Sequence, residues 1–291
     1  MSKKHAHLLM VLLIAIWAMD SVTVSVALDS VNQIFLLCAK YAFALPIVFI
    51  VVALKHGLTI PKRKDFLLLI ISALLGDVLY FFFEYTALKY LSVSTVTILL
   101  GFLPAVSYLT DCAVEKKKPN WKTFLVICIS IAGLILVVIN GESNNSHKWI
   151  GYACCAICII IWIIYGYLIR NLDKTYSSHT ITLFQMATAF VIMLPIAISH
   201  IPTSLSGRDF WISIVLMGIL SGGFGCLIEV KGLVDLGTTI SGVYGVYLNL
   251  LPVFTALAGV LFLHEHMTLI QCIGSVMIIV CGFILERQSE K

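Results

Sequence analysis

Two segments of the chain, 145 positions apart, are versions of one sequence and decide how the chain folds. Residues 84–94 read EYTALKYLSVS, and residues 229–239 read EVKGLVDLGTT. Each segment is followed by an apolar run that contains a proline, Pro104 in the first copy and Pro252 in the second. A loop with a glutamate and a last apolar run with a glycine complete both copies. The chain is therefore predicted to consist of two homologous halves.

The amino-acid composition indicates whether these halves fold in water or in a lipid bilayer. Of the 291 residues, 60% are hydrophobic and only 12% are charged, and the mean hydropathy is +1.03. Soluble domains carry roughly 25% charged residues. This chain has too few polar groups to cover a soluble enzyme or a nucleic-acid-binding domain. The composition predicts a polytopic membrane protein embedded in the lipid bilayer, with no nucleic acid among its partners.

Apolar runs between charged residues, glycines, prolines and asparagines define ten predicted membrane-spanning helices. A helix crosses a bilayer with about 20 apolar residues, so ten such helices account for most of the chain. A proline inside a membrane helix is tolerated as a kink, and we expect one at Pro252. The predicted helices cover residues 8–28, 34–54, 66–88, 92–113, 124–139, 149–169, 180–199, 210–230, 238–263 and 269–285.

The basic residues orient these helices. If the N-terminus lies inside, Lys89, Lys148 and Arg208 fall outside and Lys40 falls within the second helix. The other 15 of the 19 lysines and arginines (19 − 3 − 1) then fall inside. Lys and Arg collect on the cytoplasmic side of membrane proteins. We therefore expect both termini to be cytoplasmic and the protein to lie in the cell membrane (plasma or inner).

Five helices per half is an odd number, so the two halves must cross the membrane with opposite topology. We place them at residues 1–145 and 146–291; Trp162 follows Trp17 by the same 145 positions that separate the repeated segments. Inverted repeats with a binding site near the membrane midplane are typical of secondary transporters. The predicted fold is an all-α membrane protein of ten transmembrane helices arranged as two inverted five-helix repeats.

Motifs in both halves resemble the drug/metabolite transporter superfamily, in particular its EamA-type ten-helix members. The resemblance covers essentially the whole chain and implies transport of small metabolites, often amino acids or related compounds and commonly by export. The sequence departs from the family pattern at Glu84 and Glu229, where members commonly have an apolar or aromatic residue. The residues that carry the resemblance are Trp17, Lys40, the segments 87–94, 249–256 and 261–265, and Gly282.

Five ionisable residues fall inside or near the ends of predicted helices: Asp20, Lys40, Asp77, Glu84 and Glu229. A charge at the bilayer centre costs roughly 2.5–3.5 kcal/mol on insertion scales, so such residues usually face a cavity. The carboxylates are candidates for proton exchange or for holding a cationic amine. Lys40 is a candidate either for neutralising one acid or for receiving a substrate carboxylate. The two glutamates lie toward helix ends, so reaching the interface is an alternative for them.

Aromatic and polar residues complete the predicted site. Aromatic rings can line a pocket and stack on a cation, although most membrane aromatics pack or anchor at the interface. The candidates are Trp17 in the first helix, Tyr244, Tyr247 and Asn249 in the ninth, and Gln185 in the seventh.

These residues predict a secondary transporter of a small polar metabolite (an amino acid, amine or related compound) that works by alternating access. Proton-coupled export is one hypothesis. The alternatives are an uncoupled facilitator of an amine or zwitterion, and a non-transporting membrane scaffold or receptor subunit. No catalytic residue, metal site or cofactor is expected, since residues 264–266 (HEH) lack the histidine spacing of a helical zinc site and are interpreted as an exposed turn. A monomer or a homodimer fits equally well.

Overall fold

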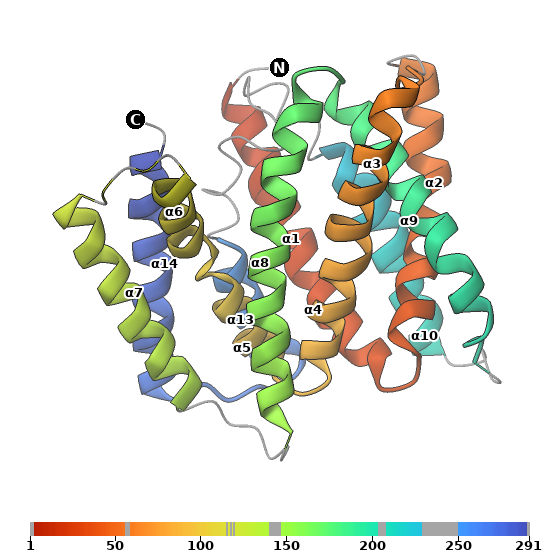
Figure 1. Ribbon diagram of the computed structural model, residues 1–291. Coiled ribbons are helices and arrows are strands. Elements are labelled where there is room, and N and C mark those ends of the chain that lie inside the picture. Colours follow the sequence, from red (N-terminus) through yellow and green to blue (C-terminus); the bar gives the residue numbers. More distant parts are fainter. Residues whose placement is uncertain are drawn as a thin grey trace.

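A computed structural model shows the chain as a bundle of helices (Figure 1). It describes residues 3–55, 59–114, 116, 118, 120–139, 147–202, 208–228 and 250–289. Within these residues every regular element is a helix. The prediction of an all-α membrane protein is confirmed.

All ten predicted spans coincide with helices in the described residues. Six helical segments are long and apolar enough to cross a membrane, and four shorter apolar helices account for the other spans. Of the ninth span, only the part from residue 250 onward is described. The first half contains α1 (Lys3–Leu28), α2 (Gln33–Lys55), η1 (Arg63–Asp65), α3 (Phe66–Ala73), η2 (Leu74–Leu79), α4 (Tyr80–Leu88), α5 (Val93–Leu100), α6 (Leu103–Val114) and α7 (Trp121–Ile139). The second half contains α8 (Lys148–Asp173), α9 (Ser178–Ile198), α10 (Arg208–Val215), η3 (Leu216–Gly225), α13 (Leu251–Phe262) and α14 (Leu269–Ser289).

Two predicted spans contain wider, π-helical turns. The third span changes from α3 into the π-helix η2 and returns to an α-helix in α4, and the eighth span changes from α10 into the π-helix η3. These are corresponding spans of the two halves. The π-helix is rare, and short π-helical segments occur frequently at functional sites. The sequence predicted continuous helices here, because hydrophobic runs do not reveal how many residues complete a turn.

The fourth span is also less regular than predicted. It breaks at Gly101 and Phe102, which form a turn between α5 and α6. A Cβ on Gly101 would lie 3.2 Å from the ring of Pro252 in α13. The break in the first half therefore lies against the proline of the second half. Pro252 itself lies in the first turn of α13, and the predicted kink upstream of it falls outside the described residues.

The packing between helices follows the inverted repeat. Three helices pack against their own counterparts in the other half: α2 on α9, α5 on α13, and α7 on α14. Several other contacts occur in matching pairs, so that α2 packs on η3 as α9 packs on α3, and α4 packs on α8 as η3 packs on α1. Many contacts between the halves are therefore made twice.

A close approach joins α7 and α14 through two glycines. A Cβ built on Gly133 would lie 2.7 Å from the carbonyl oxygen of Gly274, and one built on Gly274 would lie 2.6 Å from the carbonyl oxygen of Gly133. Small residues at such crossings let two membrane helices approach closely. Each half contributes one glycine to this contact.

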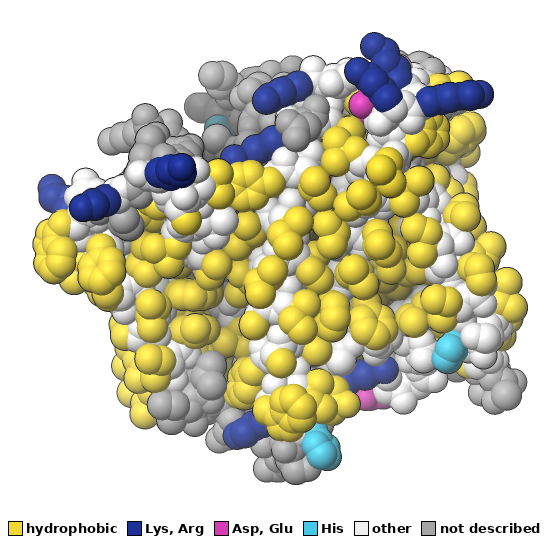
Figure 2. All heavy atoms as spheres, in the orientation of Figure 1, with side chains coloured by type: hydrophobic (Ala, Val, Ile, Leu, Met, Phe, Trp, Pro, Cys, Tyr) yellow, Lys and Arg dark blue, Asp and Glu magenta, His cyan; other side chains and the backbone are white. Residues whose placement is uncertain are grey.

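The outer surface suits a lipid environment. Figure 2 shows hydrophobic side chains covering the middle of the visible face, with Lys and Arg gathered mainly along its upper end. Both ends of the chain lie at that same upper end in Figure 1. Large apolar side chains such as Leu54, Leu67 and Val191 are largely exposed, which is the arrangement expected where lipid replaces water.

The turn at residues 264–266 is exposed at His264 and His266, as the sequence predicted, but its glutamate is partly buried and hydrogen-bonded. The carboxylate of Glu265 accepts hydrogen bonds from the backbone N–H of Val93, at 2.7 Å, and of Ser94, at 3.1 Å, and also from the Ser94 hydroxyl. The first N–H groups of a helix have no partner inside the helix, and a negative charge is favourable there. Glu265 therefore fastens the turn before α14 to the start of α5.

Candidate functional site

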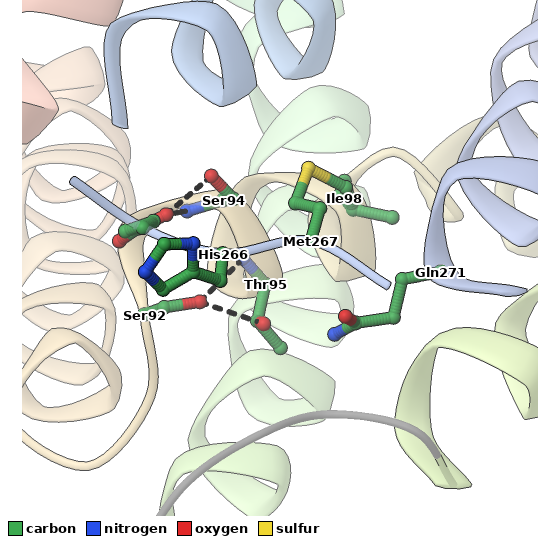
Figure 3. A pocket seen from close by; sticks show the side chains of 8 residues that line it. Ser92, Ser94, Thr95, Ile98, His266, Met267 and Gln271 are labelled. Atoms are coloured by element: carbon green, nitrogen blue, oxygen red, sulfur yellow. Dashed lines mark hydrogen bonds between the residues drawn. The ribbon is translucent and has the colours of Figure 1, made fainter. Parts of the chain in front are cut away.

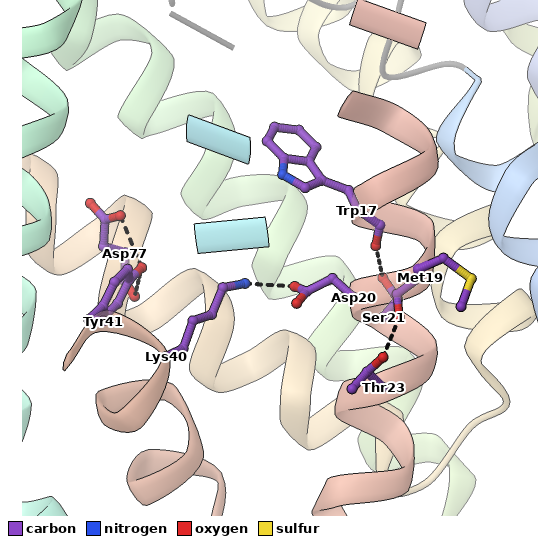
Figure 4. A network of polar contacts seen from close by, with 8 residues as sticks. All are labelled: Trp17, Met19, Asp20, Ser21, Thr23, Lys40, Tyr41 and Asp77. Carbon is purple, nitrogen blue, oxygen red and sulfur yellow. Dashed lines mark hydrogen bonds and ion pairs between the residues drawn. The ribbon is translucent and has the colours of Figure 1, made fainter. Parts of the chain in front are cut away.

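The first group of buried charges joins α1 and α2. The ammonium group of Lys40 lies 2.6 Å from Oδ2 of Asp20, and only 7% of the Lys40 side chain and 11% of the Asp20 side chain are exposed. Figure 4 shows Lys40 extending from α2 toward Asp20, with Trp17 one turn away on α1. The other carboxylate oxygen, Oδ1 of Asp20, is buried and has no hydrogen-bond partner among the described residues.

The π-helix η2 brings a second carboxylate to the same region. The hydroxyl of Tyr41 lies 3.1 Å from Oδ1 of Asp77 and 3.2 Å from the Asp77 carbonyl oxygen, so it can donate to either. Tyr41 follows Lys40 on α2, and Asp77 lies within electrostatic range of the Lys40 ammonium. The wider turns of η2 place Asp77 beside α2 while its neighbour Gly76 lies against α8.

Helix α4 supplies the third carboxylate and an aromatic surface. Glu84 lies within electrostatic range of both Lys40 and Asp20. The Lys40 ammonium lies 5.2 Å from the centroid of the Phe81 ring, a cation–π distance. The Tyr85 ring lies 6.1 Å from that of Phe81, and its hydroxyl is within electrostatic range of Asp20 and Glu84.

A different polar group occupies the corresponding place in the second half. The amide of Gln185 on α9 donates to the Ser72 hydroxyl at 2.8 Å, and its oxygen accepts from the Tyr165 hydroxyl on α8 at 3.4 Å. All three residues are buried. A Cβ on Gly76 would lie 2.7 Å from the Tyr165 ring. The charged residues and this neutral group therefore both adjoin η2, the first through Asp77 and the second through Gly76.

The repeat relates these two groups residue by residue. Adding the 145-residue offset of Trp17 and Trp162 to Asp20 gives Tyr165, and adding it to Lys40 gives Gln185. An ion pair between α1 and α2 thus corresponds to a hydrogen bond between α8 and α9. The tryptophans also occupy matching places, since Trp17 lies against Gly225 of η3 and the Trp162 ring lies 5.0 Å from that of Tyr80 at the start of α4.

The structure brings together four of the residues that the sequence predicted for the site. Asp20, Lys40, Asp77 and Glu84 form one cluster, which we call the charged cluster, with Trp17 next to it. Gln185 lies in the neutral group of the second half. The other predicted site residues lie outside the described residues: Glu229, Tyr244, Tyr247 and Asn249.

Sequence reasoning missed three neighbours of this cluster: Tyr41, Phe81 as a partner of Lys40, and Tyr85. Phe81 lies four residues after Asp77 and three before Glu84, so helical spacing could have identified it. Tyr41 and Tyr85 directly follow predicted residues, and adjacent residues of a helix do not share a face, so spacing gave no signal for them. The pairing of Lys40 with Asp20 could not be found in this way, because it depends on how α1 and α2 pack.

A small polar cavity lies away from the charged cluster, at the start of α5 (Figure 3). Its volume is about 170 Å³. Its lining includes Glu265 and its partner Ser94, and also Thr95 of α5, His266 of the turn and Gln271 of α14. Among the described residues, no group of three His, Cys, Asp or Glu side chains is arranged to hold a metal ion.

Comparison with known proteins identifies the class to which this fold and site belong. The model of the EamA-like transporter family matches the chain twice, over residues 4–139 and 149–285. The chain belongs to this family, and it is an integral membrane protein that crosses the bilayer several times.

Two individual relatives extend over nearly the whole chain. An uncharacterised transporter of Archaeoglobus fulgidus is 25% identical over 289 residues, which are 98% of each chain. A protein of known crystal structure superimposes with a TM-score of 0.68 at 18% identity, over 98% of this chain and 99% of that chain. The second likeness shows the fold alone.

Proposed function

We propose that the protein is a secondary transporter that moves a small polar metabolite, an amino acid, an amine or a related compound, by alternating access. The charged cluster carries this proposal. It places Asp20, Lys40, Asp77 and Glu84 inside membrane-spanning helices, next to a π-helical segment at the contact between two inverted repeats. Charges in membrane helices are costly and usually serve a transport path, and transporters of inverted-repeat fold bind substrate where their repeats meet.

Proton-coupled export is our proposal for the energetics. Three carboxylates, Asp20, Asp77 and Glu84, share one ammonium, that of Lys40, so the cluster can take up a proton without losing its ion pair. Such carboxylates are the usual proton carriers of transporters. A single carboxylate that binds substrate and protons in turn would couple the two movements, because both cannot occupy it at once.

The proposed setting is the cell membrane (plasma or inner), with both termini in the cytoplasm. The gathering of Lys and Arg at the end of the bundle where both termini lie supports this orientation (Figures 1 and 2), since cytoplasmic loops are enriched in these residues. We propose transport rather than catalysis, with the bilayer, a small molecule and protons as partners, no nucleic acid, and a monomer or homodimer as the working unit.

Uptake into proteoliposomes by counterflow tests this function. Vesicles that contain purified protein are loaded with one unlabelled compound at a time from a panel of amino acids, amines, nucleosides and sugars, and uptake of the same labelled compound is measured. At least one amino acid or amine is expected to accumulate transiently. No uptake for any member of the panel by folded protein would instead support the scaffold or receptor subunit.

The same vesicles test the coupling. An imposed pH gradient is expected to drive net movement by the wild type, and Asp77→Asn and Glu84→Gln are expected to reduce or remove that response. Transport that ignores the gradient in the wild type, and keeps the same rate in both variants, would indicate an uncoupled facilitator.

A further inference from the structure

We infer that the charged cluster contains a binding site for an ammonium group, formed by the free carboxylate oxygen of Asp20 and the hydroxyl of Tyr85 beside Glu84. The substrate class that follows is a small primary or secondary amine, or an amino compound held by its amine end. This inference rests on the proposed function and deepens it, because it names the group by which the substrate is recognised.

The charges of the cluster favour a cation. Around Lys40 lie the carboxylates of Asp20, Asp77 and Glu84, so one ammonium faces three acidic groups. A carboxylate ligand at Lys40 would add a fourth acidic group to these three, and like charges in a poorly hydrated site repel strongly. A second ammonium is attracted by the same three groups.

Two buried polar atoms, one in the charged cluster and one on its neighbour Tyr85, have no partner among the described residues. They are Oδ1 of Asp20 and the hydroxyl oxygen of Tyr85. Tyr85 is only 2% exposed, and its hydroxyl is within electrostatic range of the Asp20 and Glu84 carboxylates. Buried polar groups are nearly always hydrogen-bonded, so these two oxygens point to a ligand with several N–H donors. A primary ammonium group has three.

Lys40 already shows that an ammonium is accommodated in this cluster. Its Nζ combines a carboxylate at 2.6 Å with the face of Phe81 at 5.2 Å. Carboxylate and aromatic face together are the surroundings that protein sites provide for amines. Asp20 has one oxygen on Lys40 and one left for the ligand, so that a bound amine and Lys40 share this carboxylate.

The described residues of the second half do not form a corresponding site. Tyr165 occupies the position that corresponds to Asp20, and Gln185 occupies the position that corresponds to Lys40. Both are neutral, and their polar atoms are joined to each other and to Ser72. One amine site per chain is therefore expected, on the side of the first half.

Ligand-dependent thermal stability of purified protein in detergent tests the site without requiring transport. The probe is propylammonium, with propanol as the neutral and propionate as the anionic counterpart, at constant pH and ionic strength. A ligand that binds only the folded state raises its unfolding temperature with concentration. Propylammonium is expected to raise it in a saturable way, and the other two are not.

Substitutions in the proposed site test whether propylammonium binds there. Tyr85→Phe keeps the ring and removes the hydroxyl, and it is expected to raise the half-saturating propylammonium concentration at least 5-fold. Asp20→Asn with Lys40→Met makes the pair neutral without leaving a lone charge, and it is expected to abolish the shift. The matched control is Tyr176→Phe, which removes a hydroxyl that contacts Asp65 near the end of α8 and is expected to leave the response unchanged.

Equal shifts with propanol or propionate, no shift of the wild type, or an unchanged response in both Tyr85→Phe and the neutral double variant would overturn the inference. The result is separable from the proposed function. Saturable amine binding without any counterflow would refute transport and leave the site standing, whereas counterflow of a compound without an amine, together with no propylammonium shift, would refute the site alone.

Discussion

The two halves of the molecule share a fold but differ in what they place at equivalent positions. In the first half, Asp20 and Lys40 form an ion pair with further acids around it; in the second half, Tyr165 and Gln185 form a neutral hydrogen bond. The helices that carry them pack in matching ways. The difference shows that the two halves share a scaffold while a few repeat-related positions differ in chemistry, and that among the described residues the charges of the candidate site lie in the first half.

The largest expected effect is a loss of stability when the ion pair of the first half is broken. Lys40→Met leaves Asp20 buried without its counter-ion, and removing one partner of a buried pair costs about 3–5 kcal/mol. At the equivalent position, Gln185→Met removes neutral hydrogen bonds, worth about 1 kcal/mol each. Reversible unfolding in mixed micelles measures both variants.

Restoring neutrality provides the control for that experiment. Asp20→Asn combined with Lys40→Met is expected to be more stable than Lys40→Met alone, because no uncompensated charge remains. A Lys40→Met protein no less stable than Gln185→Met would mean that the ion pair and the hydrogen bond are equivalent, contrary to the comparison.

The next largest loss of stability is expected at the contact of α7 and α14, to which each half contributes one glycine. Gly133→Ala and Gly274→Ala each bring a Cβ within 2.7 Å of a carbonyl oxygen across the contact of α7 and α14, and such overpacking costs about 1–3 kcal/mol. The two variants are expected to lose similar stability in the same unfolding measurement. Clearly unequal losses of stability would show that the two glycines are not packed equally tightly in this contact.

The matched control for these glycines is Gly166→Ala. A Cβ there meets nothing within 4 Å, and a helical glycine is less favourable than alanine by roughly 0.5–1 kcal/mol. This variant is therefore expected to be as stable as the wild type or slightly more stable.

A smaller effect is expected at the Glu265 turn. Glu265→Ala removes the partner of the first N–H groups of α5, and loss of a helix cap costs about 0.5–2 kcal/mol. Glu265→Gln keeps an acceptor without the charge and is expected to fall between the wild type and Glu265→Ala. If both variants unfold at the same free energy as the wild type, the turn does not stabilise α5.

Much of the fold could be predicted from the sequence, because the bilayer restricts chains to apolar helices of set length and the repeat supplies the topology. The π-helices η2 and η3 could not, since a wider turn depends on close packing such as that of Gly76 against Tyr165. The role of Glu265 was missed for a related reason, because its partners Val93 and Ser94 are 172 and 171 residues away in the chain.

The members of the charged cluster could be predicted from the sequence, but not their contacts. Asp20, Lys40, Asp77 and Glu84 stood out because charge is rare in apolar helices, and the structure places them together. The contrast with Gln185 was available from the 145-residue offset, which relates it to Lys40. Hydrophobic patterns do not determine the relative rotation of α1, α2 and η2. They therefore could not predict the ion pair between Lys40 and Asp20 or the hydrogen bond from Tyr41 to Asp77.

Counterflow uptake by three proteins, the wild type, the neutral Asp20→Asn/Lys40→Met variant and Gly166→Ala, tests the central claim most directly. The claim is that the charged cluster of the first half is the transport site. With equal amounts of folded protein per vesicle, we expect uptake of at least one amino acid or amine by the wild type and by Gly166→Ala, and at least a 10-fold loss in the neutral variant. Equal uptake by the neutral variant and the wild type would contradict it.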